Sequence, residues 1–406
     1  MAETLKLGNG IWGTKDGSLL AYNDENGNYK PLPFDFTRAS SATVVNKAGL
    51  IETVQSGIPR IDFLGNTNGA LLLEPQSTNL ITYSEDFTSW SKYNVTATND
   101  LGISPDGTLN AAKLTELSRT SAQYRSGIAV SSASAIHTFS CYVKRISGTR
   151  TAYIDLGLIT GFFNFDTETM YSAAGVGTFE NVGNGWYRIR LSHITASAAA
   201  CYLGFGNGNT ETYTSTGGAE ILFWGIQIEQ ASYPTSYIPT QGSTVTRIAD
   251  ACSQTVPDGI IGQTEGTMYW EGKFQDAQNP ILMQIVPSSA NYLSSIYIEF
   301  NKALNSIRFN IFDSGVIQTT LTTSATPETK YKIALAYKQN DIQGYVNGVS
   351  IGSDTNATIQ SGLNNLLIGG LVGYVNNNTF IGTKPNNVRL YNTRLSNSEL
   401  ATLTSL

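Results

Sequence analysis

The sequence predicts an all-β protein made of tandem β-sandwiches of the jelly-roll type, with a small β-rich segment at its N-terminus. Glycine is abundant, with 39 residues in 406, and serine, threonine and asparagine are dense throughout. The aromatic content rests on 21 tyrosines and 16 phenylalanines, while runs of alanine, leucine, glutamate and lysine at helical spacing are scarce. Short aromatic and β-branched runs separated by turn-forming residues are typical of strands in sandwiches and barrels.

The length and net charge of the chain limit the number of domains and the kinds of partner that can be expected. A chain of 406 residues is too long for one ordinary domain, so we expect three segments, at residues 1–78, 79–248 and 249–406. The net charge is −6 and no basic cluster is visible, so nucleic acid is not an expected partner. No apolar leader follows Met1, and no run approaches the ~18 apolar residues of a membrane span. We therefore expect a chain made in a cytoplasm, without membrane insertion.

The N-terminal segment, residues 1–78, is expected to form short strands. Ser18–Tyr22 has the apolar character of a strand, and the turn-rich stretch Asn23–Asn28 follows it. Four blocks come next: Phe36-Thr-Arg-Ala-Ser-Ser-Ala-Thr43, Gly49-Leu-Ile-Glu52, Pro59-Arg-Ile-Asp62 and Leu71-Leu-Leu-Glu-Pro-Gln-Ser-Thr-Asn-Leu80. In this order and spacing, with Tyr83-Ser-Glu-Asp-Phe87 behind them, the blocks resemble a module of virion proteins from tailed bacteriophages. The resemblance implies that this segment anchors the chain to other virion proteins.

The middle segment, residues 79–248, reads as an independent sandwich. Turns recur at intervals near ten residues, which suits a jelly roll. The expected strands are His137–Lys144, Thr151–Leu156, Gly161–Asp166, Gly185–Leu191, Cys201–Phe205 and Ala219–Glu229. The sequence motifs along these strands resemble those of the carbohydrate-binding-module-like jelly rolls in the same phage proteins. An extended linker with two prolines, Tyr233–Arg247, ends the segment.

The last segment, residues 249–406, has the clearest strand pattern. Apolar residues alternate with smaller or charged ones along Tyr331–Lys338, so one face of that strand is apolar. Asn347-Gly348 accepts the positive φ angles of a type I′ turn and predicts a hairpin. Val388–Tyr391 is a further expected strand, and a short helical tail follows at Ser396–Leu400. From about residue 255 to 406 the segment resembles the concanavalin A-like lectin fold in its laminin-G-like or pentraxin-like form.

The residue types needed for catalysis are scarce. Only two histidines are present, and no nucleophile, phosphate-loop or dinucleotide motif appears. Glycosidases need two facing carboxylates, whereas Glu271 and Glu299 each stand alone in their strands. We therefore predict that the protein is not an enzyme. The three cysteines, at 141, 201 and 252, are expected to be buried free thiols, with a Cys141–Cys201 disulfide as the alternative.

Sugar recognition is the site hypothesis that remains. Aromatic faces stack on pyranose rings, and amides bond the hydroxyls. The candidate carbohydrate-binding residues are Tyr292, Tyr374, Asn376, Asn377 and Asn378. Other loop aromatics are Trp90, Tyr93 and Tyr213. The alternative for the 374–380 stretch is an ordinary solvated loop.

No cofactor is expected; two histidines and three scattered cysteines do not suit a zinc site, and calcium is the possible ion. Its oxygen ligands would come from Asp313, Asp341, Asn347, Asp354 and Asn376–Asn378. These residues do not gather into a carboxylate-rich loop, so we interpret them as turn formers.

Together these observations predict a non-enzymatic structural protein of a phage virion, a head or tail fibre, spike or capsid decoration subunit. It would display its sandwiches for attachment to host-surface glycans. The expected partners are capsid, portal or tail proteins, further copies of the chain in a trimer or dimer, and a host glycan. Two alternatives stay open: a decoration protein without a ligand, and a polysaccharide-degrading enzyme.

Overall fold

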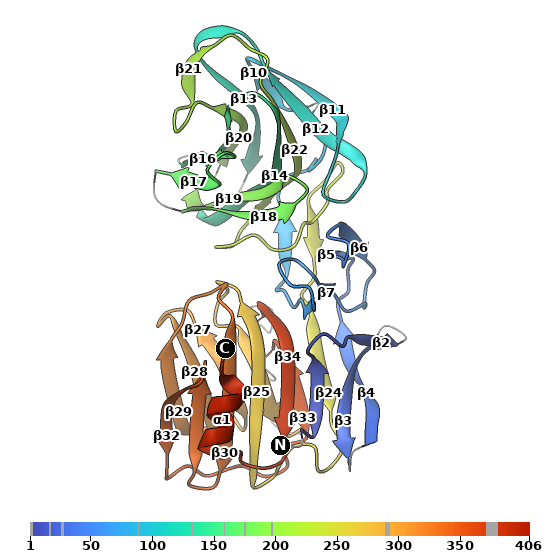
Figure 1. Ribbon diagram of the computed structural model, residues 1–406, viewed down its shortest axis with the longest axis vertical. Helices are drawn as coiled ribbons and strands as arrows, with labels where there is room; N and C mark the ends of the chain where they lie inside the picture. The colour runs from blue at the N-terminus through green and yellow to red at the C-terminus, as the bar shows by residue number, and fades with distance from the viewer. Residues whose placement is uncertain are drawn as a thin grey trace. The chain divides into compact units, whose positions relative to one another are not determined.

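The computed structural model describes residues 3–15, 18–25, 28–87, 89–131, 134–157, 159–173, 176–195, 198–288, 293–370 and 381–406. Antiparallel strands dominate this part of the chain, and its one helix is a short C-terminal one (Figure 1). The predicted all-β class, with tandem sandwiches, is therefore confirmed. Within the described residues no helix is long and apolar enough to cross a membrane.

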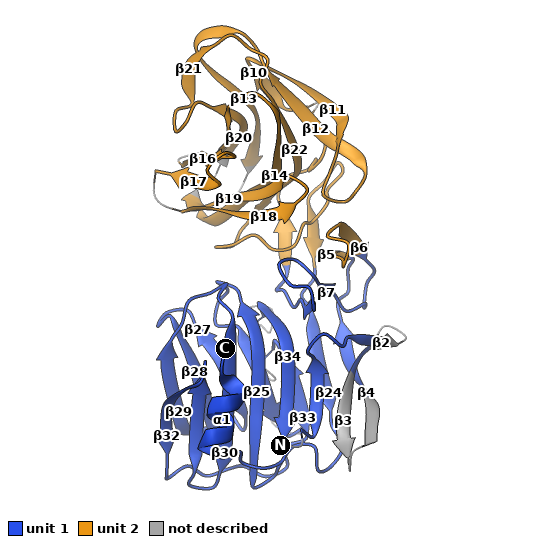
Figure 2. Cartoon of the chain, in the orientation of Figure 1, with its two compact units in different colours: residues 1–41, 54–76, 248–406 blue, residues 42–53, 77–247 orange. Residues whose placement is uncertain are grey.

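The chain divides into two compact units, which Figure 2 colours separately. Unit 1 comprises residues 1–41, 54–76 and 248–406, and unit 2 comprises residues 42–53 and 77–247. The backbone therefore passes between the units four times, after Ser41, Thr53, Gln76 and Arg247. Compactness does not measure which segments fold alone, so the expected division into three domains stays a prediction.

Unit 1 contains one long sheet in the order β29-β28-β27-β26-β33-β24-β4-β3-β1-β34-β25-β30-β31-β32, with β2 on β3, and the small pair β7-β8. The bounds of its strands are β1 (Leu5–Gly8), β2 (Gly13–Lys15), β3 (Ser18–Glu25), β4 (Asn28–Thr37), β7 (Ile61–Asp62), β8 (Ala70–Leu71), β24 (Ala251–Thr255), β25 (Glu265–Phe274), β26 (Ile281–Val286), β27 (Ile296–Asn301), β28 (Ser306–Asp313), β29 (Val316–Ser324), β30 (Tyr331–Lys338), β31 (Ile342–Val346), β32 (Val349–Asp354), β33 (Asn365–Ile368) and β34 (Thr383–Tyr391).

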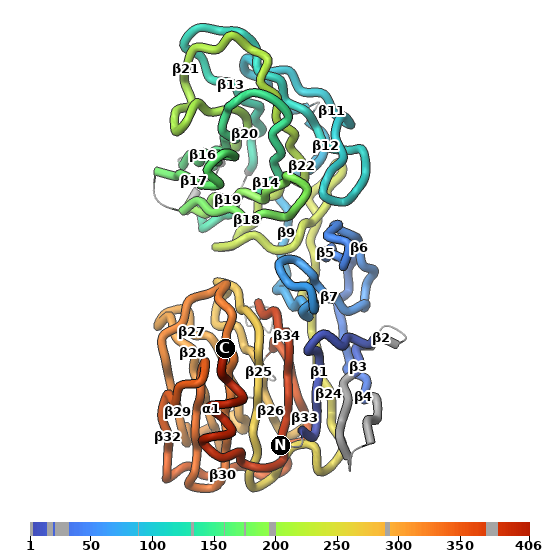
Figure 3. Tube along the Cα trace, viewed as in Figure 1, coloured from blue at the N-terminus to red at the C-terminus, as the bar shows by residue number. Residues whose placement is uncertain are grey.

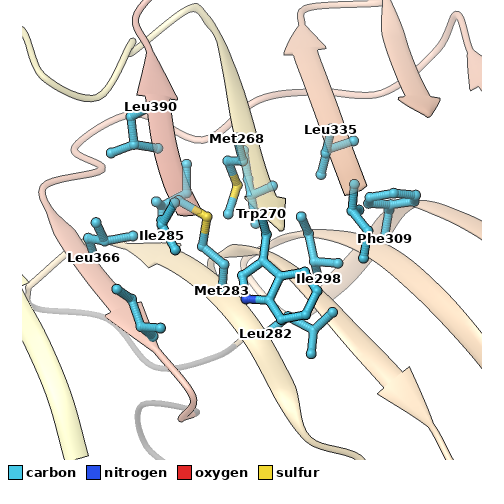
Figure 4. Packing of buried hydrophobic residues seen from close by; sticks show 14 of the residues in the cluster. Met268, Trp270, Leu282, Met283, Ile285, Ile298, Phe309, Leu335, Leu366 and Leu390 are labelled. Atoms are coloured by element: carbon cyan, nitrogen blue, oxygen red, sulfur yellow. The ribbon is translucent and has the colours of Figure 1, made fainter. Parts of the chain in front are cut away.

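The two halves of this sheet lie face to face and enclose the core of unit 1. Met268 and Trp270 on β25 pack with Met283 on β26 and Ile298 on β27, and all four side chains are fully buried (Figure 4). Side chains on a strand alternate between its faces, so every second residue of both halves points into this layer. Trp270 is the largest side chain at its centre (Figure 4).

The N-terminal strands complete the C-terminal sandwich. Strand β1 pairs with β34, with Leu5 opposite Leu390 and Leu7 opposite Val388. Figure 3 shows β1, from the start of the chain, beside β34, from its end. Strand β4 in turn pairs with β24. Residues far apart in the sequence thus share one hydrogen-bonded sheet.

The predicted turn and helix in unit 1 are confirmed. Asn347 and Gly348, with φ of 49° and 83°, form the two-residue loop between β31 and β32. Helix α1 (Asn397–Thr404) begins after Ser396, whose hydroxyl and the Glu399 side chain form a reciprocal capping box. The apolar side of α1 buries Leu400 against a cluster that includes Tyr269 and Tyr345.

A buried ion network in unit 1 contains one residue from each of three of the four N-terminal blocks: Arg38, Arg60 and Glu74. Arg38 Nη1 lies 3.1 Å from Asp250 Oδ1, and Arg60 contacts the other oxygen of Asp250 and, at 2.7 Å, Glu74 Oε2. All four side chains are at most 1% exposed. The Glu74 amide also donates to Asp250, at 2.8 Å. Two guanidinium groups thus balance two carboxylates inside unit 1.

Unit 2 is a second sandwich, with sheets in the orders β10-β13-β20-β15-β16-β17 (β21 on β13) and β11-β12-β22-β14-β19-β18, and two small pairs, β23-β9 and β5-β6. The bounds of its strands are β5 (Ala42–Val45), β6 (Ile51–Val54), β9 (Ser77–Asn79), β10 (Ser91–Tyr93), β11 (Val95–Ile103), β12 (Leu109–Glu116), β13 (Arg119–Ser131), β14 (Ala135–Ser147), β15 (Thr151–Leu156), β16 (Thr160–Asn164), β17 (Thr169–Ser172), β18 (Gly177–Gly183), β19 (Trp186–Thr195), β20 (Ala198–Gly206), β21 (Thr212–Ser215), β22 (Glu220–Glu229) and β23 (Val245–Arg247).

Both sheets of unit 2 contribute to one core. Ile154 on β15 and Leu203 on β20 pack in the same cluster as Phe139 on β14 and Ile189 on β19, each 0% exposed. The same core holds Cys141 and Cys201, and Cys252 lies in the core of unit 1. All three cysteines are buried free thiols, as predicted, and the alternative Cys141–Cys201 disulfide is absent.

Candidate functional site

The sugar-binding residues predicted from the sequence cannot be placed. Tyr292, Tyr374, Asn376, Asn377 and Asn378 all lie outside the residues that the structure describes. That prediction therefore stays untested. Of the other aromatics, Trp90 and Tyr213 are buried at 3% and 8% exposure, whereas Tyr93 is 45% exposed.

Tyr93 begins a row of residues across one sheet of unit 2. It lies opposite Arg125 on β13, and Arg125 lies opposite Gly204 on β20. The row continues through Tyr153 on β15, Phe162 on β16 and Tyr171 on β17, each directly opposite its neighbour: Gly204–Tyr153, Tyr153–Phe162 and Phe162–Tyr171. Directly opposed residues lie on the same face of a sheet. This is the outward face, because Ile154 and Leu203 point from the same strands into the core.

We call this surface the tyrosine face, defined by Tyr93, Arg125, Tyr153, Asp155, Phe162, Tyr171, Tyr202 and Glu211. Tyr93 and Tyr171 mark its two ends, 45% and 46% exposed. They are separated by five strand spacings of about 4.8 Å, which allows a span of up to about 24 Å. Tyr153 and Phe162 form a buried floor between them, at 1% and 3% exposure.

Arg125 and Tyr202 form a stacked pair on this face. The guanidinium carbon lies 3.8 Å from the centroid of the Tyr202 ring and 5.9 Å from that of Tyr93. Gly127 lies opposite Tyr202 in the next strand, and a Cβ there would come within 2.2 Å of the ring. Glycine at 127 is therefore required for Tyr202 to lie low across the sheet beneath Arg125.

Two carboxylates share one hydroxyl at the centre. The Tyr153 hydroxyl lies 2.8 Å from Asp155 Oδ2 and 2.8 Å from Glu211 Oε2. A phenol has one proton, so it can donate to only one of these oxygens at a time. Arg125 Nη1 donates to the Tyr153 hydroxyl at 3.2 Å and lies 3.6 Å from both carboxylates. The centre thus offers both donors and acceptors.

Burial controls the protonation of this centre. Burial raises the pKa of Asp155, although the Tyr153 hydroxyl, the Gly157 amide and Arg125 act in the opposite direction. The pKa of Tyr153 is also raised, chiefly by burial and then by the charge of Asp155. Tyr153 therefore stays a neutral phenol at physiological pH.

A separate cleft of about 640 Å³ lies in the same unit. Its lining residues are Tyr83, Glu85, Asp86, Asn99, Asp100, Asn110, Pro239, Thr240, Gln241, Ser243 and Val245. Tyr237 and Asn110 donate to Glu85, and Asn99 donates to Asp86. Burial raises the pKa of Glu85. Two carboxylates of the cleft are thus already bound by neighbouring groups, and a single tyrosine lines it, so the tyrosine face is the better candidate for stacking on a sugar.

The calcium candidates that can be placed have partners of their own. Asp341 pairs with Arg394 at 2.8 Å, and Asp354 accepts from the Thr319 hydroxyl at 2.8 Å and from a backbone amide. Among the described residues no group of three or more His, Cys, Asp or Glu is placed to hold a metal ion. Asn376–Asn378 lie outside those residues, so calcium binding stays a prediction.

The sequence predicted three strands of the tyrosine face, β15, β16 and β20, but not β10, β13 or β17 and not the face itself. Tyr153 and Tyr202 each alternate with core residues along one strand, as Tyr202 does between Cys201 and Leu203. An aromatic at a solvent-side position was the available signal. Alternation does not reveal which strands are neighbours, and the face needs six of them.

Comparison with known proteins bears on unit 1. Residues 261–401, about a third of the chain, match the model of the concanavalin A-like lectin/glucanases superfamily. No curated protein matches the chain. The prediction of a lectin-like fold in the last segment agrees with the family match. The resemblance of the N-terminal blocks to phage virion proteins has no counterpart in these comparisons and stays a prediction.

Several solved structures are similar to parts of this chain. The Ruminococcus gnavus IT-sialidase CBM40 bound to α2,3-sialyllactose is 14% identical, covers 36% of this chain and 84% of its own, with a TM-score of 0.32. A SAP-like pentraxin from Limulus polyphemus is 12% identical over 35% and 70% of the two chains, with a TM-score of 0.31. Domains LG4-5 of the mouse laminin α1 chain are 11% identical over 77% and 91%, with a TM-score of 0.26. At these values the likenesses carry no argument about a ligand.

Proposed function

We propose that this chain is a non-enzymatic glycan-binding protein and that the tyrosine face of unit 2 is a binding surface for its ligand. The observation that carries the proposal is the cross-strand row from Tyr93 to Tyr171, which presents exposed rings at both ends of a polar centre. Aromatic rings provide flat apolar contact, and Arg125 with its two carboxylates provides hydrogen bonds to hydroxyl groups. The lectin-type family match at residues 261–401 supports sugar binding as the function class.

The test is glycan binding by the full chain and by the variant Tyr93→Ala. Loss of one stacking ring removes about 0.5–1.5 kcal/mol, so we expect affinity to fall roughly two- to tenfold. Tyr83→Ala is the matched control, since Tyr83 is 37% exposed in the same unit but lines the separate cleft. Equal loss in both variants, or loss in Tyr83→Ala alone, would move the site to the cleft. No binding to any glycan would favour a structural protein without a ligand.

We further propose that the protein is displayed on the virion of a tailed phage, as a fibre, spike or decoration subunit. The four N-terminal blocks and Tyr83-Ser-Glu-Asp-Phe87 support this. Attachment would be multivalent: a dimer or trimer, present in many copies, rebinds at high effective concentration and so compensates weak single contacts. Sedimentation of the purified chain tests the oligomer, and peptide mass spectrometry of purified particles tests the location. A monomer absent from particles would contradict both.

The proposal of a binder is separable from that of an enzyme. The two carboxylates of the tyrosine face both contact a phenol and a guanidinium, so neither faces an open position across from the other. Release of reducing sugar from a bound polysaccharide, abolished by Asp155→Asn, would refute the non-enzymatic assignment.

A further inference from the structure

We infer that the tyrosine face accepts uncharged glycans and glycans containing amino sugars, and that it excludes acidic sugars. This inference rests on the proposed function, because it concerns the ligand class of the same surface. Its basis is the charge count at the centre of the face: one guanidinium, Arg125, stands between two carboxylates, Asp155 and Glu211.

The positive charge of Arg125 is already balanced by two carboxylates. Its Nη1 lies 3.6 Å from Asp155 and 3.6 Å from Glu211, and donates to the Tyr153 hydroxyl. One face of its guanidinium is covered by the Tyr202 ring, at 3.8 Å, and its Nε is buried without a hydrogen-bond partner, so a ligand cannot reach that face or that nitrogen without displacing its neighbours. An acidic sugar would have to compete with two carboxylates that already hold this cation.

The remaining charges define what the surface attracts. One cation against two carboxylates leaves a formal charge of −1 when both acids are ionised. Glu211 is the accessible member, with a side chain that is 37% exposed, whereas the side chain of Asp155 is only 10% exposed. A sugar carboxylate or sulfate near Glu211 is repelled, an ammonium group is attracted, and a neutral hydroxyl can donate to the carboxylate oxygens.

The buried acid adds to this selectivity. Asp155 is either negative or neutral and never positive, so the exclusion of anions is strongest where both acids are ionised and should weaken as a fall in pH protonates them. The other titratable groups facing Asp155 are Tyr153 on its own strand, Arg125 on β13, Tyr202 directly opposite on β20 and Glu211 in the loop before β21; Cys201 lies on the core side of β20. Arg125 is the only cation among them.

The experiment is a glycan array in which neutral oligosaccharides stand beside their sialylated, sulfated and glucosamine-containing counterparts, probed with the full chain at low and physiological salt. We expect binding to neutral and glucosamine-containing members, and at least tenfold weaker signals from the matched acidic ones. Stronger or equal binding to the sialylated or sulfated members would overturn this inference and leave glycan binding intact. Absence of binding to every member would overturn the proposed function and this inference with it.

The variant Glu211→Gln assigns the effect to this face. The amide keeps an oxygen for the Tyr153 proton but removes one negative charge. A unit charge about 4 Å away is worth about 1 kcal/mol in water, so the ratio of neutral to acidic binding should fall about fivefold. Glu180→Gln, an exposed position on β18 of the other sheet, makes the same change in net charge and should leave the ratio unchanged. An unchanged ratio in Glu211→Gln, or an equal fall in both variants, would refute the assignment to the tyrosine face.

Discussion

Asp250 holds two buried guanidinium groups, so we predict that Asp250→Asn severely destabilises unit 1. One carboxylate oxygen contacts Arg38 and the other contacts Arg60, and the second also accepts the Glu74 amide. In the wild-type protein two positive charges face two negative charges with every side chain at most 1% exposed. Asparagine removes one negative charge and leaves a net positive charge in the interior.

Breaking a buried ion pair by removing one partner costs about 3–5 kcal/mol. Domains are stable by only about 5–15 kcal/mol, so the loss is a large share of the total. The backbone carbonyls of Gln55 and Ile58 still accept from Arg38, which keeps the cost inside this range. Because Arg60 keeps Glu74, complete loss of the fold is not expected.

Urea denaturation, followed by circular dichroism, measures the effect. Asp341→Asn is the control, because Asp341 pairs with Arg394 in the same unit but its side chain is 51% exposed. An exposed pair is worth about 0–1 kcal/mol, so the control should unfold near the wild-type midpoint. A loss in Asp250→Asn below about 1 kcal/mol, equal to that of the control, would show that the buried charges do not stabilise unit 1.

Three further predictions test other features. Gly127→Ala should displace the Tyr202 ring, cost roughly 1–3 kcal/mol in thermal unfolding and weaken glycan binding. In a Tyr202→Ala background the same change should cost much less, because only the 3.1 Å approach to the Cys201 carbonyl remains, and an equal cost in both backgrounds would contradict the contact. Burial raises the pKa of Glu299, so this group stabilises the fold below its unfolded pKa and loses that contribution as pH rises through the folded pKa. Glu299→Gln should therefore flatten the decline in the free energy of unfolding above about pH 4, measured by denaturation at several pH values. An unchanged slope in the variant would refute this prediction. Burial also raises the pKa of all three thiols, to about 12 for Cys201. The native protein should therefore not react with a thiol reagent at pH 8, whereas all three cysteines should react in the unfolded chain. Reaction of the native protein would contradict the burial of the thiols.

Local chemistry determined much of the fold in advance. Alternation along Tyr331–Lys338 marks an apolar face because successive side chains of a strand point to opposite sides. Asn347-Gly348 forms its hairpin because only such residues adopt two positive φ angles at low cost. Ser396 and Glu399 begin the helix because their side chains bond the free amides at its start. Each of these features depends on a few neighbouring residues.

The sites depended on pairings that no local pattern contains. Arg38 and Asp250 are 212 positions apart, and burial of one charge requires the other to arrive. The tyrosine face assembles from six strands, and its register decides that Arg125 meets Asp155 and Glu211 and not solvent. The sequence by itself therefore determined the all-β class, many of the strands, the Asn347-Gly348 turn and the buried thiols, which follow from short-range sterics and hydrophobicity. The tertiary structure alone decided which side chains of different strands come together, because the order and register of strands are set by long-range packing.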